Sequence, residues 1–427
     1  MKEWDNFNQI TKAKGIWLID SKGKKMIDAV ASMWCNVWGH SNAQLIKSIT
    51  YQTKKLQHSS MFNLTNEPAE KLATNLVRMS PGMYKVFYSD NGSSAMEIAI
   101  KMSLQYWKNI GDKKKTQIAA VENGYHGDTF GAMSVGYVPE FFGKFKKQLF
   151  STIQFPVPNK YRIPKGTTHL DYQNYCLDKI ENKLSKNNNI AAFVMESGAQ
   201  VAGGVIIYPK GFQRKIRQLC KKYNVLFVLD EIATGFGRLG SMLQYEEQES
   251  IPDIVAYGKM LTGGYLTMAA TLANKKIYDS FLGEFNDWKH LFHGHTYTGN
   301  PIAAAVANEN FSMYKKHNLI KKIQKTSKVF EKFYDEILNI DIVGDIRHKG
   351  MLMGIELVTD KEKKTPIHPK KSINKIFFEE GRNQGIYLRT LGNIVMLVPP
   401  LAITEKELNL LLNRTIKTIR SARSKVL

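Results

Sequence analysis

An aspartate and a lysine in the middle of the chain have residue types and positions that could do chemistry. Asp230 ends the apolar run VLFVL and opens DEIATGFGRLG, and Lys259 follows the apolar run IVAYG just before a glycine pair. Short continuous apolar runs are typical of strands buried on both faces of a parallel sheet, and ligands bind beyond the carboxyl ends of such strands. Taken singly, the aspartate could be a turn residue and the lysine a solvated loop residue. Together they predict a binding site.

A carboxylate and an amine at neighbouring strand ends are the groups that pyridoxal phosphate requires. The carboxylate keeps the pyridine nitrogen protonated, so that the ring withdraws electrons, and the lysine amine holds the cofactor as a Schiff base. We therefore predict Asp230 and Lys259 as catalytic and cofactor-binding residues. Ile232, two positions after Asp230, is placed to press against one face of the ring.

The segment SDNGSS (89–94) could hold the phosphate of such a cofactor. Gly92 permits a tight turn between the run YKVFY and a helix that we predict from Ala95. Ser93 and Ser94 then offer backbone amides and hydroxyls at the positive end of that helix. The alternative interpretation is an ordinary helix N-cap.

The loop NGYHGDTFGAMSVG (123–136) follows the apolar run QIAAV and carries a tyrosine beside a histidine and a glycine. Tyr125 could stack on the cofactor ring, or it could be half-buried packing. His126 has no second metal ligand at helical or loop spacing, so we predict no metal there.

A second polar loop, FHGHTYTGNP (292–301), precedes a helix that we predict from about Pro301. Thr296 offers a hydroxyl to a phosphate. Its two histidines, His293 and His295, have the spacing of a metal pair but lack a third ligand, which argues against a metal site.

The elements that must position these residues alternate between strands and helices. Helical periodicity separates the apolar runs, for example along Phe212, Ile216, Leu219 and Tyr223. This alternation predicts an α/β core over residues 50 to 310. Its strands include residues 117–121, 191–195 and 225–229.

The pattern of predicted strands and helices changes after about residue 330. Strand-like runs at 350–358 and 392–400 are separated by a predicted helix at 371–384, and an amphipathic helix follows at 404–420. We expect the strand-like pieces of the first 50 residues to pack with this part. The predicted division is a small domain from residues 1–50 and 321–427, and a large cofactor-binding domain from residues 51–320.

The chain has 60 Lys and Arg against 38 Asp and Glu, a formal charge of +22 over 427 residues. Such an excess is compatible with a nucleic-acid-binding protein. The lysines are scattered over predicted turns and loops without interleaved aromatic residues, which favours a solvated surface. We predict no nucleic-acid partner, and this function remains the alternative from a different class.

Several features indicate a cytoplasmic protein. No run approaches 18 apolar residues, so we expect no transmembrane helix and no membrane partner. The N-terminal MKEWDNFNQITKAKG lacks the apolar core and cleavage site of a secretory signal. The three cysteines, Cys35, Cys176 and Cys220, have no disulfide or metal-ligand spacing.

These motifs together resemble the class III pyridoxal-phosphate aminotransferases. The resemblance rests on DEIATGFGRLG, YGKMLTGGY, NGYHGDTFGAMSVG, FHGHTYTGNP and SDNGSSAMEIAIKM, and it covers nearly the whole chain. It implies fold type I, with a mostly parallel sheet in a large domain and a smaller α+β domain built from both termini. It also implies a homodimer.

Other segments are similar to the branch of this family that aminates 7-keto-8-aminopelargonate to 7,8-diaminopelargonate in biotin biosynthesis. The amino donor would be S-adenosylmethionine or lysine, because Met33 stands where S-adenosylmethionine users often have the first tryptophan of a pair. An upstream HPxTxM segment of this branch is not in the sequence. The runner-up is an ornithine, acetylornithine or 4-aminobutyrate aminotransferase, which Ala233 and Trp34 disfavour. The similar segments are residues 26–40, 57–73, 103–111 and 388–400.

The resemblance also implies roles for individual residues. Lys259 would form the Schiff base and Asp230 would hold the pyridine nitrogen. Tyr125 would stack on the ring and line the substrate site. The phosphate would be bound by Ser93 and Ser94, and by His295 and Thr296 from the neighbouring subunit; the substrate would be contacted by Met33, Trp34, Tyr125, Lys259, Gly294 and Arg389.

Overall fold

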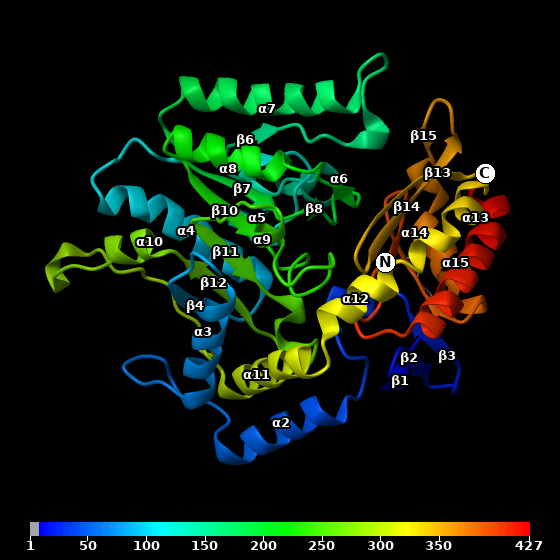
Figure 1. Cartoon of the computed structure of the whole chain (residues 1–427), viewed down its shortest axis with the longest axis horizontal. Helices are drawn as coiled ribbons and strands as arrows, with labels where there is room; N and C mark the ends of the chain where they lie inside the picture. The colour runs from blue at the N-terminus through cyan, green and yellow to red at the C-terminus, as the bar shows by residue number, and fades with distance from the viewer. Residues whose placement is uncertain (1–7) are drawn as a thin grey trace. The chain divides into compact units, whose positions relative to one another are not determined.

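The computed structural model describes residues 8–427, which divide into two units (Figure 1). The central unit consists of Ser48–Phe236 and Leu243–Asn310, and the terminal unit consists of the described residues up to Lys47, Gly237–Met242 and Phe311–Leu427. Two helices continue from one unit into the other along the chain, α2 (Ala43–Lys55) and α11 (Pro301–Lys316).

A seven-stranded sheet forms the core of the central unit. Six strands are parallel, and only β12 runs antiparallel to its neighbours. The residues of β7 and β10 are buried along their whole length, which explains why the sequence shows continuous apolar runs there. In spatial order the strands are β4 (Lys85–Ser89), β12 (Ala269–Ala273), β11 (Ile254–Tyr257), β10 (Leu226–Asp230), β7 (Ile190–Glu196), β5 (Gln117–Val121) and β6 (Thr152–Phe155).

Helices cover this sheet. Met96 and Ala99 of α4 (Gly92–Asn109) pack in one apolar cluster with Val194 and Val228 of the strands. Figure 1 shows α7 and α8, in green, running side by side, and the two helices are in contact. The other elements of the central unit are α3 (Glu67–Met79), α5 (Phe130–Val135), α6 (Pro139–Phe142), η1 (Gly143–Gln148), η2 (Lys160–Arg162), α7 (His169–Lys186), β8 (Ala199–Gln200), β9 (Ile206–Ile207), α8 (Phe212–Lys222), α9 (Gln244–Glu247), η3 (Lys259–Thr262), α10 (Lys275–Ser280) and η4 (Phe285–Asp287).

The terminal unit joins the two ends of the described chain in one sheet. Strand β3 (Lys25–Asp28) pairs in parallel with β16 (Ile386–Tyr387), which confirms that the N-terminal strands pack with the C-terminal part. The first sheet has the order β1 (Ile10–Lys14), β2 (Trp17–Asp20), β3, β16, and the second has β13 (Val343–Lys349), β14 (Leu352–Asp360), β18 (Ile394–Leu397), β17 (Arg389–Leu391), with β15 (Thr365–Pro366) beside β14. The segment α1 (Ala31–Trp34) is a turn with non-helical backbone angles at Ser32 and Met33. The helices are α12 (Leu319–Ser327), η5 (Phe330–Phe333), α13 (Tyr334–Leu338), η6 (Pro369–Lys371), α14 (Ile373–Asn383) and α15 (Glu405–Val426).

The segment Gly237–Met242, which the sequence predicted within the large domain, lies in the terminal unit. Its backbone and side chains bond to residues of that unit. The Met351 N–H donates to the carbonyl of Arg238 at 2.8 Å, and the buried guanidinium of Arg238 donates to the carbonyl of Pro399 at 2.7 Å. No residue pattern in this short stretch indicates such long-range partners.

The helix after SDNGSS starts earlier than predicted. It begins at Gly92 rather than at Ala95, because the side chain of Asn91 accepts a hydrogen bond from the Ser94 N–H at 3.0 Å and caps the helix. Ser93 and Ser94 therefore belong to its first turn.

Within residues 8–427, no helix has the length and apolar character needed to cross a membrane. The segment assessed above for a secretory signal begins in residues 1–7, which lie outside the described residues.

Candidate active site

Asp230 and Lys259 both lie at the carboxyl edge of the central sheet. Strand β10 ends at Asp230, which is paired opposite Ala256 of β11 and opposite Glu196 of β7 in parallel ladders. Lys259 follows β11 by two residues. Parallel pairing brings the carboxyl ends of these strands to one edge, as the apolar runs predicted.

The carboxylate of Asp230 is buried and held by two hydrogen bonds. Only 4% of the residue is exposed. Its Oδ2 lies 2.8 Å from Nδ1 of His126, and its Oδ1 accepts the Ile232 N–H at 2.9 Å. His126 is buried too, so this pair meets away from water, where its hydrogen bond is strong. The sequence marked His126 only as a rejected metal ligand, and the structure makes it the partner of Asp230.

Glu196 adds a second buried carboxyl group at the same edge. Burial raises its pKa to about 7, while nearby His126 opposes the rise and Asp230 adds to it. Its two oxygens accept the Tyr125 N–H at 3.3 Å and the Val201 N–H at 3.0 Å. Glu196 thereby fastens the loop of Tyr125 and His126 to the end of β7. Nothing in its sequence context indicated this role.

The first turn of α4 touches the Tyr125 loop through Ser93. The hydroxyl of Ser93 accepts the Asp128 N–H at 3.2 Å. Gly127 has a φ of 127°, and a Cβ on it would collide with Ser93. This close approach places the backbone amide of Ser93 at a helix N-terminus beside the loop, an arrangement suited to an anion, while the Ser94 N–H donates to Asn91.

Ile232 is the point at which three parts of the site meet. A Cβ on Gly92 would lie 2.9 Å from its Cγ2, and a Cβ on Gly258 would lie 3.2 Å from the same atom. Gly92 begins α4 and Gly258 precedes Lys259. The helix N-terminus, the end of β10 and the lysine loop are therefore packed around one side chain, with glycine where any other residue would crowd it.

Lys259 has an unusual backbone conformation. Its φ is 45°, a left-handed value that costs a non-glycine residue free energy and that clusters at functional sites. The turn is held by Asn310, whose side-chain amide donates to the carbonyls of Met260 at 2.8 Å and Leu261 at 3.1 Å. Gly263, also left-handed, ends the turn. The structure thus fixes the lysine by backbone constraints that the sequence showed only as a glycine pair.

Tyr125 packs against two phenylalanines that the sequence did not single out. Its ring stacks on Phe142 with centroids 6.1 Å apart and meets Phe141 edge-on at 6.4 Å. Its hydroxyl donates to Asp128 at 3.1 Å. Both interpretations of Tyr125 given above, cofactor contact and packing, stay compatible with this geometry. Phe141 keeps 42% of its surface exposed.

The loop after η4 carries the residues assigned to a neighbouring subunit. Gly294 and Thr296 are exposed, and the ring of His295 meets His293 edge-on with centroids 4.8 Å apart. His293 in turn lies 3.2 Å from the amine of Lys101 on α4. Within the described residues, neither His295 nor Thr296 hydrogen-bonds with Asp230 or Ser93, so their assignment to the phosphate of another subunit's cofactor stays a prediction, as does the substrate contact of Gly294.

The predicted substrate residues Met33, Trp34 and Arg389 belong to the terminal unit. The structure brings two of them together: Nη1 of Arg389 lies 3.0 Å from Sδ of Met33. Met33 is 52% exposed and Trp34 only 7%. Their substrate contacts remain predictions.

Comparison with known proteins decides the family. The family model described as aminotransferase class-III matches residues 2–419. The chain belongs to the class III aminotransferases. It is 39% identical over 426 residues to the adenosylmethionine-8-amino-7-oxononanoate aminotransferase of Geobacter sulfurreducens, covering 99% of this chain and 94% of that protein. It is 43% identical over 403 residues to the Staphylococcus aureus enzyme of the same name, covering 93% and 88%.

Solved structures agree with this assignment. The adenosylmethionine-8-amino-7-oxononanoate aminotransferase of Methanocaldococcus jannaschii is 40% identical with a TM-score of 0.92, covering 98% of this chain and 94% of that one. The omega transaminase of Pseudomonas jessenii, solved in complex with PMP, is 29% identical with a TM-score of 0.94 over the same shares. The fold-type-I prediction is confirmed, and this aminotransferase depends on pyridoxal phosphate.

The residues of the site fit that cofactor. A buried carboxylate with a fixed orientation suits the pyridine nitrogen, and the helix N-terminus at Ser93 suits the phosphate. Ile232 packs against Gly92 and Gly258 next to Asp230, and Lys259 lies at the same sheet edge. In this aminotransferase, Asp230, Ser93, Ser94 and Lys259 are the groups that would hold the cofactor.

Proposed function

We propose that this aminotransferase converts 8-amino-7-oxononanoate (7-keto-8-aminopelargonate) to 7,8-diaminopelargonate in biotin biosynthesis. The observation that carries the proposal is the identity of 39 to 43% with relatives named for this substrate, which extends over nearly the whole length of both chains. The buried His126–Asp230 pair beside the Lys259 loop supplies the catalytic groups that such a reaction needs.

Each catalytic residue has one physical task. When bound, the cofactor would supply an electron sink and a carrier for the amino group that is transferred from the donor to the oxo acid. Asp230 holds a proton on the ring nitrogen, and His126 keeps the carboxylate turned toward it. The amine of Lys259 carries the proton that leaves the donor Cα, acting as base and then as acid. Tyr125 and Ile232 would contact the two faces of the ring.

The oxo acid combines a long aliphatic chain with a terminal carboxylate. Arg389 suits the carboxylate, because a guanidinium binds a carboxylate through two parallel hydrogen bonds. Met33 and Trp34 suit the aliphatic chain, and the predicted substrate contact of Gly294 belongs to the central unit. The guanidinium of Arg389 rests on the sulfur of Met33, a weak acceptor that a carboxylate would displace.

The amino donor is S-adenosylmethionine or lysine. The relatives named above take their name from adenosylmethionine. Met33, a thioether in place of an aromatic ring, is the feature that keeps lysine as the second candidate.

A homodimer would complete the site. The loop after α10 exposes large apolar side chains that a monomer would leave in water, with Phe285 80%, Trp288 63% and Tyr297 61% exposed. Phe62 at 83% adds to the exposed aromatic residues of the central unit. Exposed aromatic residues in such number are typical of a protein interface. The same loop carries His295 and Thr296, the residues assigned to the partner's phosphate.

The cytoplasm is the proposed location. Cys35, Cys176 and Cys220 are all free thiols, which suits a reducing compartment.

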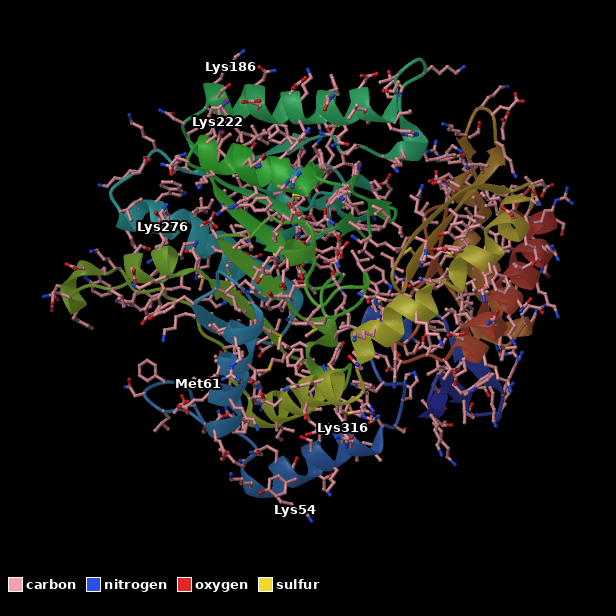
Figure 2. The ribbon with its side chains drawn as sticks, in the orientation of Figure 1. Lys54, Met61, Lys186, Lys222, Lys276 and Lys316 are labelled. Atoms are coloured by element: carbon pink, nitrogen blue, oxygen red, sulfur yellow. The ribbon has the colours of Figure 1, made fainter. Side chains whose placement is uncertain are left out.

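A nucleic-acid-binding function is the weaker candidate. Lys186, Lys222 and Lys276 of the central unit, labelled in Figure 2, are exposed and belong to three different elements, α7, α8 and α10. Lys222 is also neutralised by Glu181 at 2.7 Å. Dispersed and partly paired charges favour solvation over the continuous basic surface that a nucleic acid requires.

The proposed function is tested with the purified protein, 8-amino-7-oxononanoate and each donor separately. Mass spectrometry should detect 7,8-diaminopelargonate with S-adenosylmethionine or with lysine. A parallel assay offers 2-oxoglutarate with ornithine, acetylornithine or 4-aminobutyrate. If the protein transaminates one of these donors with 2-oxoglutarate and forms no 7,8-diaminopelargonate from the oxo acid, it is an ornithine, acetylornithine or 4-aminobutyrate aminotransferase instead. Rescue of a biotin-requiring strain that lacks this step provides the test in cells.

A further inference from the structure

The turn that carries Met33 and Trp34 has a strained backbone. Ala31, Ser32 and Trp34 have φ values of 47°, 59° and 68°, in the left-handed region that residues with a Cβ rarely adopt. Three such residues within four positions are kept only where the surroundings determine them, and such strain clusters at functional sites.

The carboxylate of Asp28 holds this turn. Asp28 ends β3 and is fully buried. Its Oδ2 accepts the Ser32 N–H at 2.7 Å and the Ser32 hydroxyl at 3.0 Å, and its Oδ1 accepts the Val30 N–H at 3.3 Å. Three donors from the turn therefore converge on one carboxyl group, which stabilises the left-handed conformation over an extended one.

His40 fixes the carboxylate from the other side. Its Nε2 lies 3.0 Å from Oδ2 of Asp28, and its side chain is 16% exposed. The backbone of His40 is itself anchored, because its N–H donates to the carbonyl of Gly15 at 2.7 Å. Gly39, with a φ of 83°, passes so close to Gly15 that a Cβ there would lie 2.9 Å from the carbonyl oxygen. The imidazole therefore meets Asp28 from a fixed position.

Arg389 follows β16, the strand that pairs with the end of β3 at Asp28. Asp28 of β3 is paired opposite Tyr387 of β16, and the Ala29 N–H donates to the Tyr387 carbonyl at 3.1 Å. Because β3 and β16 are parallel, the Met33 turn and Arg389 leave the sheet from the same end. They meet again where Arg389 Nη1 contacts Met33 Sδ at 3.0 Å.

We propose that His40 and Asp28 are positioning residues for the oxo acid substrate: they lock the strained turn and so set Met33 and Trp34 against Arg389. This inference rests on the proposed function, in which those three side chains bind the aliphatic chain and the carboxylate of the substrate. Neither His40 nor Asp28 touches the reacting atoms. Their effect is on the shape of the substrate site, and it should appear in KM rather than in the chemical step.

The test compares His40→Ala, His40→Gln and a matched control, Asp20→Asn. The glutamine side chain can still place an amide donor against Asp28. Asp20 is another buried carboxylate of the same sheet, and it accepts the N–H groups of Lys22 and Lys24 in a turn that carries no site residue. His40→Ala should raise KM for 8-amino-7-oxononanoate about tenfold with kcat changed less than about twofold, since a small displacement of a binding group weakens positioning. His40→Gln should recover most of the loss, and Asp20→Asn should keep the wild-type KM.

Two failures are distinguishable. A wild-type protein that does not aminate the oxo acid overturns the proposed function. The positioning role is overturned if the wild type is active and His40→Ala has the same KM. It is also overturned if Asp20→Asn raises KM as much as His40→Ala does. A crystal structure of His40→Ala tests the turn independently of substrate: we expect Ser32 to leave the left-handed region, and an unchanged turn would contradict the inference.

Discussion

Nδ1 of His126 lies 2.8 Å from Oδ2 of Asp230, and both side chains are buried at the carboxyl edge of the central sheet. An ionised carboxylate can only accept, so the imidazole N–H donates and fixes the direction of the remaining acceptor positions. This contact converts an aspartate at a strand end into an oriented partner for a ring nitrogen.

Removing the imidazole should slow catalysis without releasing the cofactor. His126→Ala leaves Asp230 buried with one hydrogen bond fewer, so that it holds the ring proton less well. We expect kcat to fall about 10- to 100-fold, in the range seen when a residue that orients a catalytic group is removed.

Steady-state kinetics and the cofactor content of the purified protein measure the two effects separately. His169→Ala, an exposed histidine on α7, serves as the control. A variant of His126 with wild-type kcat would contradict the orienting role.

Arg389 should determine affinity for the carboxylate of the oxo acid. Arg389→Ala should raise KM for 8-amino-7-oxononanoate about 10- to 100-fold, because a charged hydrogen-bonding pair is lost. Arg389→Lys should recover only part, since an ammonium group cannot form the two-pronged contact. The exposed Arg420→Ala, on α15, provides the control. Equal KM values for wild type and Arg389→Ala would remove Arg389 from the substrate site.

Phe141 should form part of the wall that faces the substrate beside Tyr125. It meets the Tyr125 ring edge-on and remains 42% exposed. Phe141→Ala should raise KM for the oxo acid about fivefold, because it removes an apolar contact worth about one buried methylene group.

Phe145 is the matched control for this prediction. It lies in the adjacent turn with 46% exposure and meets Phe130 instead of Tyr125. If Phe145→Ala changes KM as much as Phe141→Ala does, the effect comes from the segment and not from contact with the tyrosine.

Two buried carboxyl groups, Glu196 and Glu231, should make the folded protein less stable as the pH rises. Burial raises the pKa of Glu196 and of Glu231 to about 7, and the Gln244 and Tyr245 N–H groups oppose that rise at Glu231. A carboxyl group whose pKa is higher in the folded state than in the unfolded state costs no folding free energy as long as it is protonated in both the folded and the unfolded protein. This stability is fully present below about pH 4.5 and is lost as the pH rises through about 7.

Thermal denaturation of wild type and Glu231→Gln between pH 5 and pH 8 measures this contribution. The midpoint of wild type should fall relative to that of the variant as the pH rises, because the variant has no proton to lose at position 231. Between pH 5 and pH 8, the free energy of unfolding of wild type should fall by on the order of 3 kcal/mol relative to that of the variant. Parallel curves for the two proteins would show that Glu231 ionises normally.

The sequence predicted the scaffold and the two central residues because their signals are local. The continuous apolar runs before Asp230 and Lys259 mark strands buried on both faces, and the strands were found within a residue or two of the predicted positions. The amphipathic pattern at 404–420 likewise marked α15, which extends to Val426.

The rest of the site depends on contacts between residues that are distant in the chain. His126 and Asp230 are 104 positions apart, and no periodicity links them. The left-handed turn at Ala31 and the left-handed Lys259 are backbone states of residues that have no special preference for them, so tertiary contacts impose them. The fixed start of α4 at Gly92 depends on the cap by Asn91, which the sequence shows only as one polar residue among several.

Covalent trapping of the cofactor shows which lysine holds it, and so decides whether Lys259 forms the Schiff base with pyridoxal phosphate at the sheet edge where Asp230 lies. The protein is loaded with pyridoxal phosphate, reduced with borohydride, digested and mapped by mass spectrometry. Reduction fixes the cofactor to the lysine that holds it, and we predict a single labelled peptide with the modification on Lys259. A label on another lysine, or a Lys259→Ala variant that is labelled and active like wild type, would contradict this assignment.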